Sequence, residues 1–498
     1  MSEDAYQARG LESWAPAIGA LLAVLFGLAF ALGGDDFCLD DAWIHLSYAK
    51  SAGLGEGLSY NPGDHETGFS SPLWVLCLLV WPTSNDPVLG VKLLGVLFHA
   101  LSAWLGCTLV LELGHRRASV ETPQPLASMG LLAGLLIASQ TSALRGATSG
   151  MEVPLCAALL MGTGLAALRR QWLIAACLSA LALWARPEAL AFVTAMGAGL
   201  AVLDKERAAL LLPVGGALAL GVWIAYCLSV SGHAWPNTFY VKTSGEGDSL
   251  RYLLEEVISA EAWFIGLGGI VASAAALRRE YRAGRHFALV WFAAWGASLL
   301  AIALSRPLHP GVLFFEARYF YILSAPPLVL VALGLPDLPR AVSAISLVAV
   351  FAVNGLGAVR SHENMRAQER SVSLLHTAPA RDFETLLPAD ARVFVEGAGA
   401  TRYFAPRDME IIDALGLNRS AIAHAPDDRA KACELVRAAP THALLPDHIA
   451  APLSQVFEWR PVRAYFDPDN AMVRVRHPMQ VQLYEIVQVG EKWRERCP

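Results

Sequence analysis

The sequence places two adjacent carboxylates, Asp40 and Asp41, a few residues after its first long apolar run. Charge beside a membrane-embedded segment is costly and is usually retained for chemistry. Either carboxylate could accept a proton from an attacking hydroxyl group. The alternative is structural, because Asp40 precedes an expected helix that extends to Lys50 and suits its N-cap position. We favour catalysis, with Asp40 slightly preferred because a capping side chain would be held in place.

Charged side chains further along the chain could bind a phosphate group. Arg318 lies where a polar loop enters an apolar run, and Lys242 follows an aromatic stretch. Either cation could neutralise phosphate charge, or could be an ordinary anchor at a membrane surface. Arg186 and Glu188 lie between two short apolar runs, which is typical of a buried ion pair at a helix break and equally of a ligand contact. Glu152 begins an apolar run, where a carboxylate also suits a helix N-terminus.

His45 lies four residues after Asp41, on the same face of the expected helix. This spacing could hold a metal ion or orient Asp41 as a base. A solvated polar face is the alternative that we favour. Residues 53–74 then form a loop rich in glycine, proline and polar side chains. Such a loop is typical of an active site at a membrane surface.

Composition indicates a membrane protein. Of the 498 residues, 55% are hydrophobic and 16% are charged, whereas soluble proteins carry about 25% charged residues. The formal net charge of -6 leaves no overall basic field, which argues against nucleic acid as a partner.

Apolar runs recur through the first 360 residues, and a helix that crosses a bilayer needs roughly 17 to 25 residues. We expect about eleven transmembrane helices, the first of them a retained span because residues 1–14 lack the basic segment of a cleaved signal. The stretch 72–81 is too short to span and should lie in the membrane interface or dip back. The expected helices cover residues 15–32, 88–112, 125–143, 151–168, 171–184, 188–203, 207–229, 262–277, 287–304, 319–336 and 340–358.

Basic residues near the ends of these runs predict the orientation of the chain. If the N-terminus is cytoplasmic, every basic loop falls on the cytoplasmic side. The Asp40 loop and all residues after about 360 then share the outer face. We therefore expect a multi-pass protein of the inner (plasma) membrane with a periplasmic C-terminal domain. The basic residues are Arg116, Arg117, Arg169, Arg170, Lys205, Arg207, Arg278, Arg279, Arg282, Arg285 and Arg340.

The fall in apolar density after residue 360 predicts two domains. Residues 1–359 should form a transmembrane module whose outer loop, residues 33–87, carries the two aspartates. Residues 360–498 should form a soluble α/β domain of ordinary size. Its strands are expected at residues 392–396, 409–413, 442–445 and 481–487, and its helices at 400–404 and 429–437.

Two small features of this second domain carry predictions of their own. Gly397 and Gly399 fit a tight turn between strand and helix better than a dinucleotide-binding loop, whose third glycine is missing. Cys433 and Cys497 are the only cysteines after residue 360. They could form a disulfide in an oxidising compartment.

Several short motifs follow one another in a distinctive order along the whole chain. They are Asp40-Asp41-Ala42-Trp43-Ile44, Tyr60-Asn61-Pro62-Gly63, Glu66 with Gly68-Phe69-Ser70-Ser71-Pro72-Leu73-Trp74, Gly150-Met151-Glu152, Arg186-Pro187-Glu188, Pro236-Asn237-Thr238-Phe239-Tyr240-Val241-Lys242, Glu316-Ala317-Arg318-Tyr319 and Ile412-Asp413-Ala414-Leu415-Gly416-Leu417-Asn418. Together they resemble the GT-C integral-membrane glycosyltransferases, in particular the bacterial arabinofuranosyltransferase-like branch, which uses a polyprenyl-phosphate sugar as donor.

The resemblance implies an inverting glycosyltransferase at the outer face of the membrane. It would move a sugar, for example a pentofuranose such as arabinofuranose, from polyprenyl phosphate to a cell-envelope glycan or glycolipid. Asp40 and Asp41 would be catalytic. The implied phosphate-binding residues are Arg318, Lys242, Arg186, Tyr240 and Asn237, and the implied substrate-binding residues are His45, Glu66, Ser70, Trp74, Glu152, Glu188 and Tyr319. No cofactor is required, because the donor is not a nucleotide sugar; a divalent metal near Asp40 is an unsupported alternative.

Other interpretations remain for the aromatic residues and for the function. Trp43, Tyr60, Phe69 and Trp74 could stack on sugar rings, although an interfacial aromatic belt is the simpler expectation. A transporter or flippase of lipid-linked sugars would place charges and broken helices deep in several spans. A membrane anchor that displays a carbohydrate-binding domain would carry its polar cluster after residue 360. The polar motifs gather at one expected face and mostly precede residue 360, which favours the enzyme.

Overall fold

The computed structural model describes residues 3–81, 87–118, 126–243, 247–254, 259–305, 314–472 and 476–497, without the side chains of residues 3–11, 259–267 and 314–317. The chain divides into two compact units. The bundle unit comprises Met1–Gly33, Leu89–Val222 and Glu246–Glu363, and the sheet unit comprises Gly34–Val88, Trp223–Gly245 and Asn364–Pro498. The boundaries of these units differ from those of the expected domains. Residues 34–88 and 223–245 belong to the same unit as the C-terminal residues.

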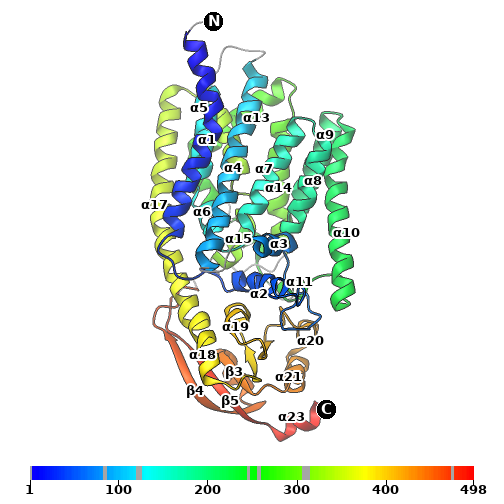
Figure 1. Cartoon of the computed structure of the whole chain (residues 1–498). Coiled ribbons are helices and arrows are strands. Elements are labelled where there is room, and N and C mark those ends of the chain that lie inside the picture. The colour runs from blue at the N-terminus through cyan, green and yellow to red at the C-terminus, as the bar shows by residue number, and fades with distance from the viewer. Residues whose placement is uncertain are drawn as a thin grey trace. The chain divides into compact units, whose positions relative to one another are not determined.

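The bundle unit is built from helices, and each of the eleven predicted apolar runs coincides with at least one of them. Figure 1 shows α1 running beside α5 and α7 beside α8. The helices are α1 (Glu3–Ala31), α4 (Pro87–Ala118), α5 (Leu126–Ser139), α6 (Thr141–Thr148), α7 (Val153–Leu168), α8 (Trp172–Ala185), α9 (Ala189–Leu203), η1 (Arg207–Leu210), α10 (Leu211–Ser231), α12 (Ser249–Tyr252), α13 (Ser259–Arg282), α14 (Phe287–Ser305), α15 (Phe314–Tyr321), α16 (Pro326–Gly334), η3 (Leu335–Asp337) and α17 (Arg340–Val372).

Five helices in the described part of the chain are long and apolar enough to cross a membrane. They are Glu12–Ala31, Pro87–Arg117, Arg207–Ser231, Phe287–Ser305 and Arg340–Leu386. The bent pair α5 and α6 could form a sixth span, and four further apolar helices have 10–17 residues. The predicted fold class, a polytopic helical membrane protein with a C-terminal α/β part, is confirmed.

Two predicted helices are broken in the structure. The run 125–143 bends by 55° between α5 and α6, where the Gln140 side chain accepts a hydrogen bond from the Ala143 N–H (2.5 Å) and caps the second helix. The run 319–336 is interrupted after Tyr321, and α16 begins with two prolines. Proline suits a first helical position because its missing N–H would have no partner there.

Glycine sets the close approach of α1 to α5. A Cβ atom on Gly19 would lie 2.9 Å from the Cα atom of Gly134, so neither position has room for a side chain. Small residues at such crossings let helix backbones touch, and apolar packing then holds them together within a bilayer.

The sheet unit joins three stretches that are far apart in sequence. Residues 34–88 contribute α2 (Asp41–Gly53) and α3 (Pro72–Val80), and residues 223–245 contribute α11 (Asn237–Thr243). The short α3 agrees with the prediction that residues 72–81 form no span. The remaining elements are η4 (Ser373–Thr377), α18 (Ala378–Leu386), β1 (Arg392–Val395), α19 (Ala398–Phe404), β2 (Glu410–Asp413), α20 (Ser420–Ala423), α21 (Asp428–Arg437), β3 (His442–Pro446), α22 (Asp447–Leu453), β4 (Phe457–Asp467), β5 (Met479–Val489) and α23 (Glu491–Arg496).

The five strands form one sheet in the order β2-β1-β3-β5-β4. Strand β1 is parallel to β2 and β3, whereas β5 is antiparallel to β3 and β4. Figure 1 shows the long strands β4 and β5 side by side. The four predicted strands are confirmed, and so is the turn from β1 into α19 at Gly397. Strand β4 was not predicted, because its exposed edge carries Arg460, Pro461 and Arg463 in place of an apolar alternation.

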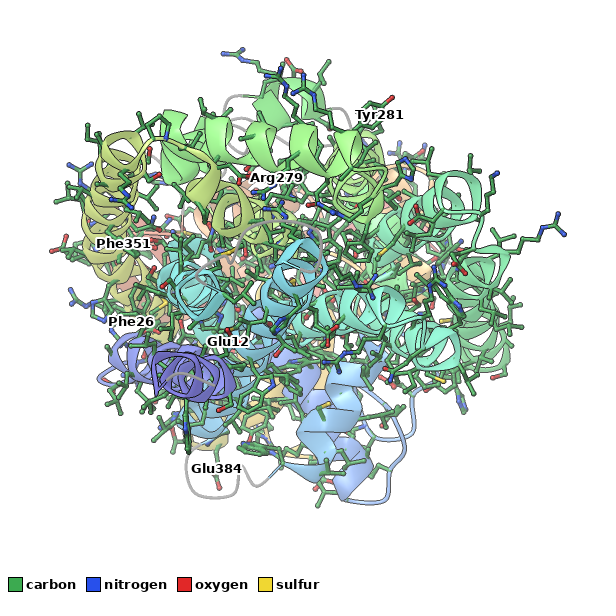
Figure 2. The ribbon with its side chains drawn as sticks, turned by 90° about the horizontal axis from the view of Figure 1, so that it is seen from above. Glu12, Phe26, Arg279, Tyr281, Phe351 and Glu384 are labelled. Carbon is green, nitrogen blue, oxygen red and sulfur yellow. A yellow bond between two sulfur atoms is a disulfide. The ribbon has the colours of Figure 1, made fainter. Side chains whose placement is uncertain are left out.

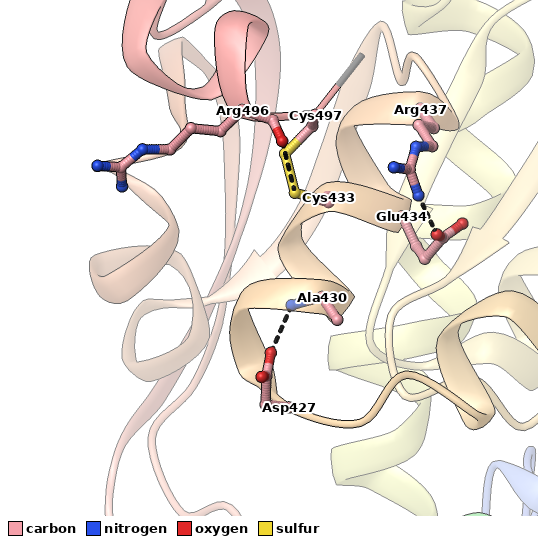
Figure 3. The surroundings of a disulfide bond; sticks show 7 residues. All are labelled: Asp427, Ala430, Cys433, Glu434, Arg437, Arg496 and Cys497. Carbon is pink, nitrogen blue, oxygen red and sulfur yellow. Dashed lines mark hydrogen bonds and ion pairs between the residues drawn. A yellow bond between two sulfur atoms is a disulfide. The ribbon is translucent and has the colours of Figure 1, made fainter.

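A disulfide fixes the end of the chain. It joins Cys433 of α21 to Cys497, as the sequence predicted (Figure 3). At the start of α21, Asp427 accepts a hydrogen bond from the Ala430 N–H (2.7 Å) and caps the helix. The disulfide therefore attaches the last turn of the chain to a well-defined helix.

Candidate active site

Asp40 binds a helix other than the one it precedes. It stands at the N-cap position of α2, but its side chain makes no capping hydrogen bond there. Its carboxylate oxygens accept the N–H groups of Gly399 (2.7 Å) and Ala400 (2.9 Å) in the first turn of α19. A Cβ atom on Gly399 would lie 2.0 Å from the Asp40 carbonyl oxygen, so this contact requires glycine. Asp40 thus attaches the loop to the sheet.

Asp41 forms an ion pair with Lys242, whose Nζ atom lies 2.8 Å from the aspartate Oδ2. Both side chains keep some exposure, 14% for Asp41 and 19% for Lys242. The charge-assisted hydrogen bond holds the two side chains together.

His45 is buried in the helix that Asp41 begins. Its Nδ1 atom lies 3.2 Å from the Asp41 carbonyl oxygen, and the residue is only 5% exposed. The prediction that His45 lies on a solvated polar face is therefore wrong, because the C-terminal segment packs onto α2. The described residues contain no group of three or more histidine, cysteine, aspartate or glutamate side chains that could hold a metal ion.

Glu66 joins three stretches of the sheet unit, its own and those of two hydrogen-bond donors. One of its oxygens, Oε2, accepts hydrogen bonds from the Asn237 side-chain amide (2.8 Å) and from the Ser420 N–H and hydroxyl (2.8 and 2.6 Å). The predicted site residues Glu66 and Asn237 are thus brought together, and Ser420 joins them. Asn237 and Lys242 both belong to α11, so one short helix contacts both Glu66 and Asp41.

A buried aspartate holds the turn after β2. Asp413 accepts the N–H groups of Leu415, Gly416 and Asn418 and the Asn418 side-chain amide. The Asn418 side-chain oxygen then accepts the Tyr48 hydroxyl (3.1 Å). Burial raises the pKa of Asp413 to about 6. The sequence motif around Asp413 therefore connects α2 to the sheet.

The side chain of Asn61 forms hydrogen bonds with the backbone of the outer strand of the sheet. Its amide donates to the Ile411 carbonyl (3.1 Å) and accepts the Ile411 N–H (2.9 Å) on the outer strand β2. Arg402 is buried and donates to Asn61, to the Met409 carbonyl and to neighbouring carbonyl groups. Asp64 accepts the Asn61 N–H, and burial raises the pKa of Asp64 to about 6.

The aromatic residues of the loop form a core. Trp43, Tyr60, Phe69 and Trp74 are at most 1% exposed, so the expectation of an interfacial belt is wrong. Trp43 packs against aromatic rings of α19, and Tyr48 packs against Phe69. Ser70, beside this core, is half-buried.

A stack of rings lies near Ser420. His233 and His424 are stacked with ring centroids 3.7 Å apart, and Tyr240 lies 4.3 Å from His424. Burial and the nearby His233 lower the pKa of His424. Tyr240 was predicted from its motif, whereas the two histidines carried no sequence signal, because 191 residues separate them.

The bundle unit buries the remaining candidates as a charged cluster. The Arg186 Nε atom lies 3.4 Å from Glu152 and 3.5 Å from Glu188, and the guanidinium donates to the Arg318 carbonyl (3.4 Å). Arg186 and Arg318 both lie over the Tyr319 ring, 4.9 and 5.3 Å from its centroid. The predicted ion pair at the helix break is confirmed and includes a second glutamate. The side chain of Glu316 lies outside the described residues.

The predicted residues therefore form two groups, one in each unit. The sheet unit collects Asp40, Asp41, His45, Lys242 and, around Glu66, Asn237. The bundle unit collects Arg186, Arg318, Glu152, Glu188 and Tyr319. In the sheet unit, the partly exposed Asp41 can accept a proton. Residues missed by the sequence are Arg402, Ser420, His233 and His424; each has a partner that is distant in the sequence, Asn61 for Arg402 and Glu66 for Ser420.

Comparisons with known proteins bear on the fold. Residues 363–488 match the family model described as "Domain of unknown function (DUF8728)". No curated protein matches the sequence. The structure is similar to the crystal structures of ArnT from Cupriavidus metallidurans, in the apo state and bound to undecaprenyl phosphate, each with TM-score 0.60, 13% identity and coverage of 94% of this chain and 97% of that chain.

A second similar structure is the Archaeoglobus fulgidus oligosaccharyltransferase in complex with zinc and sulfate. Its TM-score is 0.52 at 11% identity, over 88% of this chain and 68% of that chain. At these identities the likeness concerns the fold. The similarity to these two membrane proteins agrees with the fold that the motifs implied.

Proposed function

We propose that this chain, whose fold is that of the GT-C membrane glycosyltransferases, transfers a sugar from a polyprenyl-phosphate donor to an acceptor hydroxyl group. The fold it shares with ArnT, which has been crystallised with undecaprenyl phosphate, supports a donor of this class. The observation that carries the proposal is the pairing of a partly exposed carboxylate, Asp41, with Lys242.

In the proposed reaction the acceptor oxygen attacks the anomeric carbon from the face opposite the phosphate. The bond between that carbon and the phosphate oxygen breaks, and the polyprenyl phosphate leaves with the bonding electrons, so the anomeric configuration inverts. Asp41 accepts the proton of the attacking hydroxyl group. A positioned general base of this kind contributes about 100- to 10,000-fold to the rate.

The structure changes our preference between the two aspartates. Both oxygens of Asp40 accept backbone N–H groups of α19, so this side chain holds the loop against that helix. We therefore assign Asp40 to positioning and Asp41 to catalysis. Lys242, released from Asp41 when that carboxylate takes the proton, would be free to neutralise the charge on the departing phosphate.

Roles for the other predicted residues are part of the proposal. Arg186 already faces Glu152 and Glu188, so we assign it to holding the helix break. Arg318, the second cation of that cluster, is our candidate for binding donor phosphate. Phosphate contacts by Tyr240 and Asn237 remain predictions. So do the substrate contacts of His45, Glu66, Ser70, Trp74, Glu152, Glu188 and Tyr319.

The finer assignments rest on the sequence. We propose arabinofuranose as the first sugar to test and an envelope glycan or glycolipid as acceptor. A site at the outer face of the plasma membrane is supported by the disulfide between Cys433 and Cys497, because disulfides persist in oxidising compartments.

The test is transfer by the purified full chain in lipid nanodiscs, offered a panel of polyprenyl-phosphate sugars and glycan acceptors. Asp41→Asn keeps the size of the side chain but removes the proton acceptor, so turnover should fall by about 100- to 10,000-fold with little change in melting temperature. Asp35→Asn, an exposed position in the same loop, is the matched control and should transfer at the wild-type rate.

Two results would count against the proposal. Wild-type turnover by folded Asp41→Asn would remove Asp41 as the base. Movement of lipid-linked sugars across vesicles without a covalent product from any donor would favour the transporter or flippase.

A further inference from the structure

An apolar cavity opens among α5, η3 and α17 of the bundle unit, far in sequence from every candidate catalytic residue. Its volume is about 490 Å³. Most of its wall is hydrocarbon, with two serines and one cation. The lining residues are Ser128, Met129, Leu132, Leu335, Pro336, Leu338, Arg340, Ser343, Ala344 and Leu347.

The cation of this cavity, Arg340, has no acidic partner among the residues that the structure describes. It is exposed and is the first residue of α17, where a positive charge gains nothing from the helix dipole. The Ser343 hydroxyl already donates to the Leu335 carbonyl (2.7 Å). Arg340 is the charged residue of this lining, so its guanidinium can meet the negative charge of a ligand.

A second cavity, whose lining also includes a residue of η3, is basic. Its volume is about 600 Å³, and its lining includes Arg278, Arg279 and Arg282 with one acid, Asp337. Arg279 forms an ion pair with Asp337. Arg278 and Arg282 are exposed and form no ion pair within the described part of the chain. Figure 2 shows Arg279 among the helices, whereas Tyr281 lies at the margin of the bundle.

We propose that the apolar cavity binds an anionic phospholipid of the surrounding bilayer. One acyl chain lies along Leu132, Leu335 and Leu347, and the phosphate group contacts Arg340. The combination of a hydrocarbon wall and a cation at the mouth matches both parts of such a molecule. Basic pockets between transmembrane helices are known to hold anionic headgroups.

Charge complementarity favours an anionic phospholipid over a zwitterionic one. Around η3 the two cavities present Arg340, Arg278, Arg282 and Arg279 against the single carboxylate of Asp337. A zwitterionic headgroup would bring its own positive charge into this field, whereas phosphatidylglycerol brings only the negative one. Free phosphate would satisfy Arg340 but would leave the apolar wall uncovered.

The test is native mass spectrometry of the detergent-purified full chain, titrated with phosphatidylglycerol or phosphatidylcholine of identical acyl chains. We expect phosphatidylglycerol to bind at least ten times more tightly. Arg340→Gln should remove this preference, and Ala344→Trp, which fills the cavity from an exposed position of α17, should weaken binding of both lipids. Arg360→Gln, an exposed arginine on the same helix outside the cavity, should behave like wild type.

Three results would each overturn the proposal. Equal affinity for the two lipids would mean ordinary annular lipid, and an Arg340→Gln variant with wild-type preference would place the headgroup elsewhere. Displacement of phosphatidylglycerol by millimolar inorganic phosphate would mean that the site recognises the phosphate group alone. Because the readout is binding, these results are independent of the proposed transfer reaction.

Discussion

Two acids of the bundle unit and three acids of the sheet unit are held by different kinds of partner. In the bundle unit, fully buried Arg117 pairs with Glu280 at 2.6 Å and lies 3.6 Å from Asp337. In the sheet unit, Asp40, Glu66 and Asp413 are held by N–H and O–H groups. Guanidinium groups compensate the charge of Glu280 and Asp337 where burial excludes water, whereas acids of the sheet unit are satisfied by backbone donors.

The difference also separates Asp41 from its neighbours. Of Asp40, Asp41, Glu66 and Asp413, Asp41 is the one that faces a cation. The other three hold segments together. Among these four acids, the type of partner therefore distinguishes the proposed base from the three structural acids, and three substitutions test the comparison.

The largest effect on stability is expected at Arg117. Arg117→Met would leave Glu280 and Asp337 with fewer positive charges in a buried setting, and breaking such a pair costs about 3 to 5 kcal/mol. Arg285 and Arg279 still contact these acids, which places the expected loss of unfolding free energy near the lower figure. Thermal unfolding in detergent measures it.

Arg169→Met is the matched control, because Arg169 pairs with Glu112 at the surface of the same unit, with side chains 40% and 31% exposed. Its cost should be below about 1 kcal/mol. Adding Glu280→Gln to Arg117→Met should recover part of the loss. Equal melting temperatures for the Arg117 and Arg169 variants would show that buried pairing does not stabilise the bundle.

An intermediate effect, dependent on pH, is expected at Asp413. Its pKa is raised by burial from 3.8 to about 6, so the folded state binds the proton more tightly than the unfolded state. The resulting stabilisation is complete below pH 4 and is lost as the pH rises through about 6. A shift of this size corresponds to roughly 2 to 3 kcal/mol.

Asp413→Asn removes that titration. The difference in unfolding free energy between wild type and variant should therefore change by about 2 to 3 kcal/mol between pH 4 and pH 7.5. Other titrating groups, such as Asp64 and His424, are common to both proteins and cancel. A difference that stays constant with pH would show that Asp413 is not a buried titrating acid.

The smallest effect is expected at Asp40. Asp40→Asn keeps one acceptor for the first turn of α19 but places an amide against the second N–H, which should cost about 1 to 2 kcal/mol. Turnover at saturating substrate, measured below the melting temperature, should stay within a few-fold of wild type. A 100-fold loss of turnover in a fully folded variant would return the role of base to Asp40.

The sequence predicted what local chemistry determines. The apolar runs predicted the helices, because the hydropathy and length of a run can be read without knowing its contacts. The glycines at 397 and 399 predicted the turn into α19. The bend at Gln140 was missed, although the polar residues 139–142 interrupt the apolar run there. The candidate residues were recognised by type and motif, but their roles depended on contacts.

Those contacts were beyond sequence reasoning because they are long-range. The donors to Glu66 include Ser420, 354 residues away, and Tyr48 reaches Asn418 across 370 residues. His45 was expected in solvent because the segment that covers α2 follows only after residue 364. Nothing near His45 in the sequence indicates that covering segment.

The assembly of the sheet unit from three stretches of the chain has a consequence for biosynthesis. Gly399 follows Asp40 by 359 residues, and at about 5 to 20 residues per second the ribosome needs roughly 20 to 70 seconds to reach it. During that time the nascent loop has neither the α19 N–H groups nor Ser420. The loop that carries the proposed base can therefore make these contacts only after synthesis has passed residue 420.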